Sequence, residues 1–252
     1  ARKKNGCGMI KRIVALIIMF CFMWQCIVYG FKLPAFILPT PLDVLYALWQ
    51  YKLLLAQESI PTIIETLLGF GIGILLGCTT AITLTYFKNA RKWFLPILIA
   101  SQAIPTFAIA PLLVIWFGYG VTSKIVVTVI MLFFPITSNF YDGLQKTPQA
   151  YLDLAKTMNT SAWNVLIKIK IPSALPNLGA GMRIAATIAP IGAIVGEWVG
   201  ASKGLGFLML NANARMQIDI MFAALILIII LSLSLYYIVD TTVKKTIFWR
   251  TA

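Results

Sequence analysis

Few residues of this 252-residue chain could carry out covalent chemistry. It has no histidine, which excludes a Ser/His/Asp catalytic set, and we find no glycine-rich phosphate loop. The four cysteines, Cys7, Cys21, Cys26 and Cys78, lack the spacing of metal ligands and are expected to be reduced thiols. The sequence therefore indicates a protein that is not an enzyme and that binds no cofactor or metal of its own.

Three polar side chains stand out because they interrupt or border long apolar runs: Glu65, Gln102 and Glu197. A carboxylate in or beside a membrane span is costly, so it marks either a functional group or a group with a buried partner. Glu65 is expected near the membrane interface. For Glu197, near the end of its run, partial solvation is the favoured interpretation. Gln102 and Glu197 are nevertheless our candidates for lining a substrate pathway.

The composition places these residues in a membrane protein. Hydrophobic residues make up 60% of the chain, and the mean hydropathy is +0.88. A net charge of +13 could suggest nucleic acid, but the basic residues lie between apolar runs rather than in one patch. The pattern predicts an all-α polytopic protein with six transmembrane helices, at about 13–31, 62–87, 94–117, 124–141, 178–199 and 220–239. A signal peptide would also fit the basic start, but no small-x-small cleavage site follows the first run.

Glycine and proline predict how these spans pack. Gly69, Gly73 and Gly77 are four residues apart, as are Gly192 and Gly196, a spacing that lets two helices approach closely. The third run contains Pro96, Pro105 and Pro111, so its helix is expected to be broken. Broken backbone at membrane depth either lines a pathway or packs as a kink, and both alternatives remain open.

The positive charges give the orientation. Sixteen of the 21 lysines and arginines fall on the side that holds both chain ends, and five fall on the opposite side. The five are Lys32, Lys52, Lys124, Lys203 and Arg215. An excess of positive charge marks the cytoplasmic side, so both termini and the loop after the fourth span are expected there.

That loop is the longest polar interval, and it runs from Pro148 to Pro172. Pro148 suits a helix start, and Asn159 suits the left-handed turn that ends a helix. Ser161 can cap a second short helix, which Pro172 is expected to end. The sequence predicts a compact helix–turn–helix that a soluble partner could bind, or otherwise an amphipathic loop without such docking.

The same interval resembles a known signature. Permease subunits of binding-protein-dependent ABC importers carry E-A-A-x3-G-x9-I-x-L-P in this loop. The chain has Asp153-Leu154-Ala155, then Asn159, then Ile169-Lys170-Ile171-Pro172, with the same spacing at every step. Four letters differ: Asp for Glu, Leu for Ala, Asn for Gly and Ile for Leu.

The resemblance covers nearly the whole chain and implies a type I ABC importer permease fold. It implies a single domain, 1–252, with a cytoplasmic N-terminus (1–12), coupling loop (142–175) and tail (241–252). Asp153, Leu154, Ala155, Asn159, Ile169, Ile171 and Pro172 would then couple to the ATPase. The implied assembly lies in the bacterial inner membrane among its lipids: a homodimer, two ABC ATPase subunits that bind ATP-Mg, and an extracytoplasmic solute-binding protein. No nucleic acid is implied.

The implied solute is less sharply defined. Residues 102–105 and 111–118 resemble the nitrate, sulfonate and taurine branch, whereas Gly200 to Leu225 is most similar to permeases for hydroxymethylpyrimidine, the pyrimidine precursor of thiamine. Import of that precursor is the expected function, with sulfonate or taurine, nitrate and riboflavin as alternatives. A secondary transporter and a non-transporting membrane scaffold are alternatives from other classes.

Overall fold

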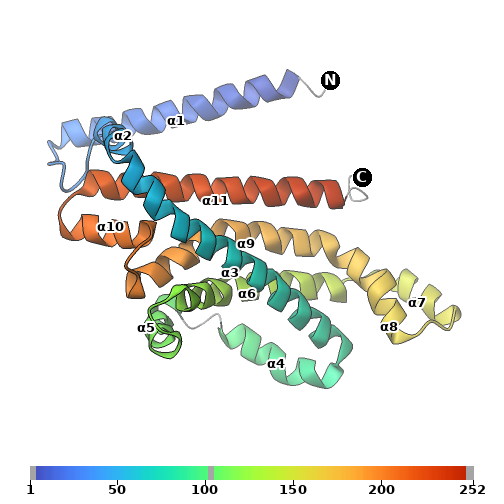
Figure 1. Ribbon diagram of the computed structural model, residues 1–252. Coiled ribbons are helices and arrows are strands. Elements are labelled where there is room, and N and C mark those ends of the chain that lie inside the picture. Colours follow the sequence, from blue (N-terminus) through green and yellow to red (C-terminus); the bar gives the residue numbers. More distant parts are fainter. Residues whose placement is uncertain (1–3, 102–104, 248–252) are drawn as a thin grey trace.

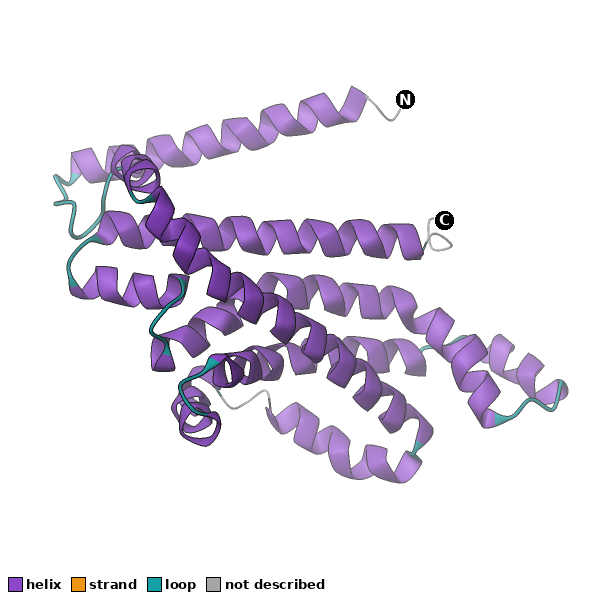
Figure 2. Ribbon diagram, viewed as in Figure 1, coloured by secondary structure: helices purple, strands orange, loops and turns teal. Residues whose placement is uncertain are grey.

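The computed structural model describes residues 4–101 and 105–247, which fold into helices joined by short turns (Figure 2). The helices are α1 (Lys4–Gly30), α2 (Pro41–Gln50), α3 (Lys52–Tyr86), α4 (Lys88–Ala100), α5 (Thr106–Phe117), α6 (Val121–Gln145), α7 (Gln149–Thr157), α8 (Ala162–Val165), α9 (Ile171–Gly200), α10 (Leu205–Ala214) and α11 (Ile218–Thr246). A π-helical turn, Leu166–Lys170, joins α8 to α9.

The long helices pack around α6, which contacts α3 and α9, and α9 in turn contacts α11. The start of α1, the end of α11 and the α7–α8 region lie at one end of the molecule (Figure 1). Helices α2 and α10 lie at the opposite end (Figure 1). We call these the α7 end and the α10 end.

Three of the four apolar clusters among the described residues follow one another between the two ends. At the α7 end, α3, α6 and the π-helical turn contribute Leu84, Phe140 and Leu166. The middle cluster joins α3, α6, α9 and α11. At the α10 end, α2, α9, α10 and α11 share a cluster that includes Leu205 and Ala224. Burial of apolar surface along the whole length therefore holds the long helices together.

Both glycine series face α6. A Cβ added at Gly77 of α3 would lie 2.7 Å from Cγ2 of Ile136, and one at Gly73 would lie 3.2 Å from Cβ of Leu132. A Cβ added at Gly69 would also lie within 3 Å of α6, at Thr128. On α9, Cβ atoms at Gly192 and Gly196 would lie 2.9 and 2.8 Å from Cα atoms of α6. The missing side chains therefore let α3 and α9 approach α6 closely.

Among the described residues, four helices are long and apolar enough to cross a membrane: Lys52–Tyr86, Val121–Gln145, Ala162–Gly200 and Ile218–Thr246. Ala15–Gly30 and α5 are shorter apolar helices. The expected third span is two separate helices, α4 and α5, and Pro105 directly precedes α5. Helix α4 ends at Ala100 and α5 begins at Thr106, and the candidate pathway residue Gln102 lies outside the described residues.

Candidate functional site

The turn between α7 and α8 is built by Asn159. Its φ is 51°, which confirms the expected left-handed conformation. The N–H of Asn159 donates to the carbonyl of Lys156 at 3.0 Å, and the N–H of Thr160 donates to that of Ala155 at 3.0 Å. These two bonds close the end of α7 as a Schellman motif. Ser161 then caps α8, accepting from the N–H of Asn164 at 3.3 Å, as its position predicts.

This turn folds the two halves of the signature together. A hollow of about 310 Å³ lies between α7 and the start of α9. Leu154 and Ala155 line it from the first half of the signature, and Ile169 and Pro172 line it from the second. The structure therefore brings together residues that lie 14 or more positions apart in the sequence.

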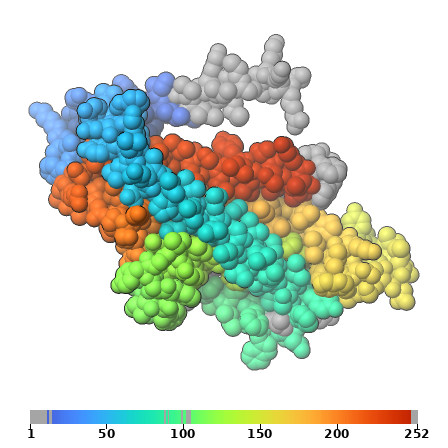
Figure 3. All heavy atoms as spheres, viewed as in Figure 1, coloured from blue at the N-terminus to red at the C-terminus, as the bar shows by residue number. Residues whose placement is uncertain are grey.

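The face of α7 that borders this open hollow is apolar and exposed. Tyr151, Leu154 and Met158, at i, i+3 and i+7, are 55%, 59% and 70% exposed. Asp153 lies beside them, and hydrogen bonds from Lys156 and Gln149 hold its pKa below the usual value. Figure 3 shows α7 projecting at its end of the molecule. Exposed apolar side chains on a protruding short helix are typical of a docking surface.

Two details of this region differ from the expectations. Pro172 does not end the second helix, because α8, the π-helical turn and α9 form one continuous helix, Ala162–Gly200. Ala155 is small because it is buried within this chain, at 3% exposed, and it contributes little surface for a partner. The continuous helix links the α7–α8 turn directly to the α10 end of the molecule.

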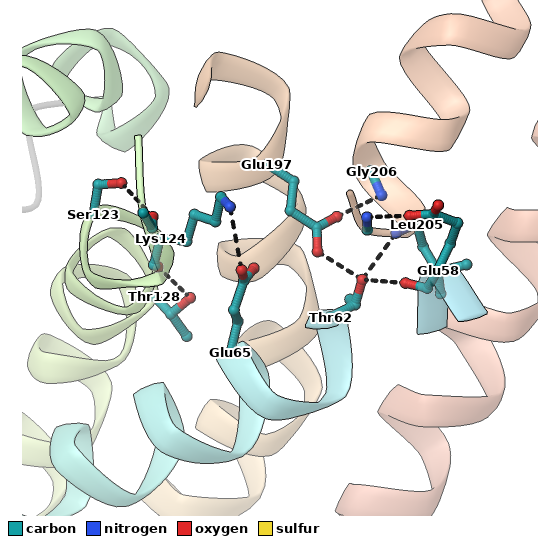
Figure 4. A network of polar contacts seen from close by, with 11 residues as sticks. Glu58, Thr62, Glu65, Ser123, Lys124, Thr128, Glu197, Leu205 and Gly206 are labelled. Atoms are coloured by element: carbon teal, nitrogen blue, oxygen red, sulfur yellow. Dashed lines mark hydrogen bonds and ion pairs between the residues drawn. The ribbon is translucent and has the colours of Figure 1, made fainter. Parts of the chain in front are cut away.

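A buried polar network lies at the α10 end (Figure 4). Glu65 on α3 is fully buried, and its Oε1 lies 3.4 Å from Nζ of Lys124 on α6, which is itself 7% exposed. Neither carboxylate oxygen of Glu65 has a hydrogen-bond partner among the described residues. The pair is therefore held by charge attraction in a setting where removal of either partner leaves a buried charge.

The second part of the network centres on Glu197 of α9 (Figure 4). The hydroxyl of Thr62 donates to Oε1 of Glu197 at 2.6 Å, and the N–H of Gly206 donates to Oε2 at 2.6 Å. The N–H of Leu205 donates to the hydroxyl of Thr62 at 2.9 Å. Partial solvation of Glu197 was the wrong expectation: the residue is 1% exposed, because α3 and α10 cover it.

The hydrogen bonds of Glu197 bear on its candidacy as a pathway-lining residue. Both carboxylate oxygens of Glu197 accept hydrogen bonds from within the chain, and the residue is 1% exposed, so the group is turned inward in this structure. Its role in a substrate pathway stays a prediction. The sequence did not identify Thr62, Lys124 or Gly206 as partners of the two carboxylates. The available signal was Gly204-Leu205-Gly206, since paired glycines after a carboxylate indicate close approach of backbone.

Comparison with known proteins identifies the family. Residues 69–247 match the model of the binding-protein-dependent transport system inner membrane component. The chain is 48% identical over 236 residues to a probable ABC transporter permease protein of Haemophilus influenzae, covering 94% of this chain and 95% of that protein. It is 38% identical over 173 residues to the formylaminopyrimidine transport permease protein ThiX of Halalkalibacterium halodurans, covering 68% and 69%.

A solved structure agrees with this at the level of the fold. The MetNI methionine ABC transporter, in inward-facing conformations, aligns with a TM-score of 0.58 at 20% identity, covering 82% of this chain and 98% of the matched chain. The family match covers most of the chain and contains the α7–α8 turn, α9 and α10. The chain therefore belongs to the binding-protein-dependent transport system inner membrane components, as a multi-pass permease subunit of an ABC importer that is not itself an enzyme.

Proposed function

We propose that α7 is the coupling helix of this permease, and that its exposed face docks into the ATPase subunit. The exposure of Tyr151, Leu154 and Met158 on one protruding helix carries the proposal. The left-handed turn at Asn159 fixes that helix against the start of α9. A movement of α7 would therefore be passed to a membrane-spanning helix rather than absorbed by a flexible loop.

The proposed assembly contains two copies of this chain, two ATPase subunits that bind ATP-Mg, and a solute-binding protein outside. The chain crosses the membrane six times with both ends in the cytoplasm, on the same side as α7. The charge bias supports this orientation, and so does the common location of α7 with the start of α1 and the end of α11. Large apolar side chains on α1, such as Phe22 at 68% exposed, are available to lipid or to the second copy.

For the solute, we propose a pyrimidine precursor of thiamine. The 38% identity to a formylaminopyrimidine transport permease supports this choice. The stretch Gly200 to Leu225, which contains α10, is where the sequence most resembles permeases of that kind. Riboflavin, sulfonate or taurine, and nitrate are the competing solutes.

Substitution of Asn159 tests the coupling proposal. Asn159→Val places a β-branched residue in the left-handed region, at a cost of at least about 1–2 kcal/mol, whereas Asn159→Gly adopts that conformation freely. We expect the Val variant to lose most of its ATPase subunits on purification and the Gly variant to retain them. Equal retention by both variants would contradict the role of this turn.

The same purified complex, reconstituted in vesicles with its binding protein, tests the solute. We expect ATP-dependent uptake of radiolabelled formylaminopyrimidine and no uptake of labelled riboflavin or taurine. Uptake of another solute alone would replace the proposed substrate but leave the coupling proposal standing. Uptake that does not depend on ATP would exclude both.

A further inference from the structure

The first turn of α10 takes its hydrogen-bond acceptors from two other helices. Gly204, at the N-cap, has no side chain with which to cap the helix. Its N–H donates to Oε2 of Glu58 on α3 at 2.5 Å, while the next two N–H groups donate to Thr62 and Glu197. Three consecutive backbone donors, which a helix start leaves unpaired, are thus satisfied by side chains from α3 and α9. We call Glu58, Thr62 and Glu197 the α10 latch.

The backbone of α10 is fitted to this latch. Gly204 has a φ of 118°, a conformation that residues with a side chain rarely adopt. A Cβ at Gly204 would collide with the carboxylate of Glu197, and a Cβ at Gly206 would lie 2.8 Å from its Oε2. Two carboxylates at the helix start also complement the positive end of the α10 dipole.

Other contacts of α10 are apolar and give less directional control. Leu205 packs in the cluster at the α10 end, with Ile194 of α9 and with Ala223 and Ala224 of α11. Apolar contacts favour burial without fixing a particular rotation of the helix. Hydrogen bonds fix distance and angle, so the latch sets how α10 is placed on α3 and α9.

Glu197 lies one turn before the end of the continuous helix that begins at the α7–α8 turn. The latch thus attaches α10 to one end of the helix Ala162–Gly200. The other end of this helix adjoins α7, which carries the proposed coupling surface. We propose that the α10 latch makes α10 move together with α9 and α3, so that a movement started by the ATPase at α7 reaches the outer surface. This inference rests on the proposed function of α7 and assigns positioning roles to Glu58, Thr62 and Glu197.

The chain offers a matched pair of variants on α3. Thr62 and Thr66 are both fully buried, but the hydroxyl of Thr66 has no hydrogen-bond partner among the described residues. Thr62→Val removes both the hydrogen bond to Glu197 and the one from Leu205 at almost constant volume, whereas Thr66→Val removes none. Thr62→Ser restores the hydroxyl, and Gly204→Ala breaks the latch from the α10 side.

The readout is a fluorophore at the exposed Lys203, attached through Lys203→Cys in a chain whose four native cysteines are replaced by alanine. The complex, with its ATPase subunits, is trapped with ATP and orthovanadate. We expect trapping to change the fluorescence in the parent chain, in Thr66→Val and in Thr62→Ser. Loss of a buried hydrogen bond to a charged group shifts an equilibrium about tenfold or more. Thr62→Val removes such a bond and Gly204→Ala places a Cβ against the carboxylate of Glu197, so both variants should lose most of the fluorescence change.

Amide exchange separates a released latch from a misfolded protein. In Thr62→Val we expect exchange to rise about tenfold at the first turn of α10 and to stay at the parent rate in α9. A full fluorescence change in Thr62→Val would overturn the latch, as would a parent complex that traps nucleotide without any change at Lys203. A parent complex that traps no nucleotide would overturn the proposed function, and the latch proposal with it.

Discussion

At the level of single residues, Lys124 and Glu65 show how pairing with an opposite charge offsets the cost of burying a charged side chain in the apolar part of this chain. The two side chains are buried together, with their nearest atoms 3.4 Å apart. Glu65 has no hydrogen-bond donor among the described residues, so the ammonium of Lys124 is the group that balances it.

Lys124→Met removes the ammonium and leaves the carboxylate of Glu65 buried without a partner. Breaking a buried pair in this way costs about 3–5 kcal/mol, whereas replacing both members with apolar residues is often neutral or stabilising. We expect the unfolding midpoint of the purified protein in detergent to fall for Lys124→Met. The double variant Glu65→Met with Lys124→Met should recover the unfolding midpoint of the parent protein. If Lys124→Met alone is as stable as the parent, the ion pair is not needed for stability.

Sequence reasoning recognised Glu65 and Glu197 as unusual because a carboxylate beside an apolar run is costly wherever the chain folds. It could not supply their partners. Thr62 and Glu197 are 135 positions apart, and only the packing of α3 on α9 brings them within 2.6 Å. The partial solvation expected for Glu197 was wrong for the same reason, since the cover comes from α10.

At the level of the helices, local signals predicted well and the tertiary context accounts for the differences. Asn159 and Ser161 act through their own backbone and side chain, so the turn between α7 and α8 was predicted from sequence. Pro172 was expected to end a helix. In the structure the N–H of Ile171 bonds to the carbonyl of Leu166, so the hydrogen-bond register has already changed to i→i−5 before the proline. The helix therefore continues through it.

The glycines that face α6 predict how an added methyl group would affect the packing of two helices. Gly192→Ala would place a Cβ 2.9 Å from the backbone of α6 at Thr128, whereas an added Cβ at Gly71 of α3 meets nothing within 4 Å. Overpacking of this kind costs about 1–3 kcal/mol, while alanine in an open helical position gains about 0.5–1 kcal/mol.

We therefore expect Gly192→Ala to lower the unfolding midpoint in detergent and Gly71→Ala to leave it unchanged or raise it. The two variants carry the same chemical change in two long membrane helices, so each serves as the control for the other. If both lower the midpoint equally, close packing on α6 is not the reason for glycine at position 192.

At the scale of the whole molecule, one helix joins the α7–α8 turn at one end to the buried polar network that holds α10 at the other end. The continuous helix Ala162–Gly200 starts at the exposed α7–α8 turn and ends at the buried network that holds α10. Hydropathy and charge bias predicted a helical membrane protein with this loop after the fourth apolar run. The three prolines of the third run predicted a broken helix, and the structure has α4 and α5 there, but the prolines do not tell whether the broken backbone lines a pathway or packs as a kink.

In the proposed assembly, the exposed face of α7 contacts the ATPase subunit in the cytoplasm. Met158→Cys, in a chain whose four native cysteines are replaced by alanine, can carry a photoactivatable crosslinker at the most exposed of the three apolar positions. In membrane vesicles that contain the assembled complex, we predict a crosslink to the ATPase subunit from Met158→Cys and none from Lys203→Cys. Docking of α7 on the ATPase subunit is contradicted if Met158→Cys gives no crosslink while the ATPase subunits remain bound, or if it is labelled only from the outside.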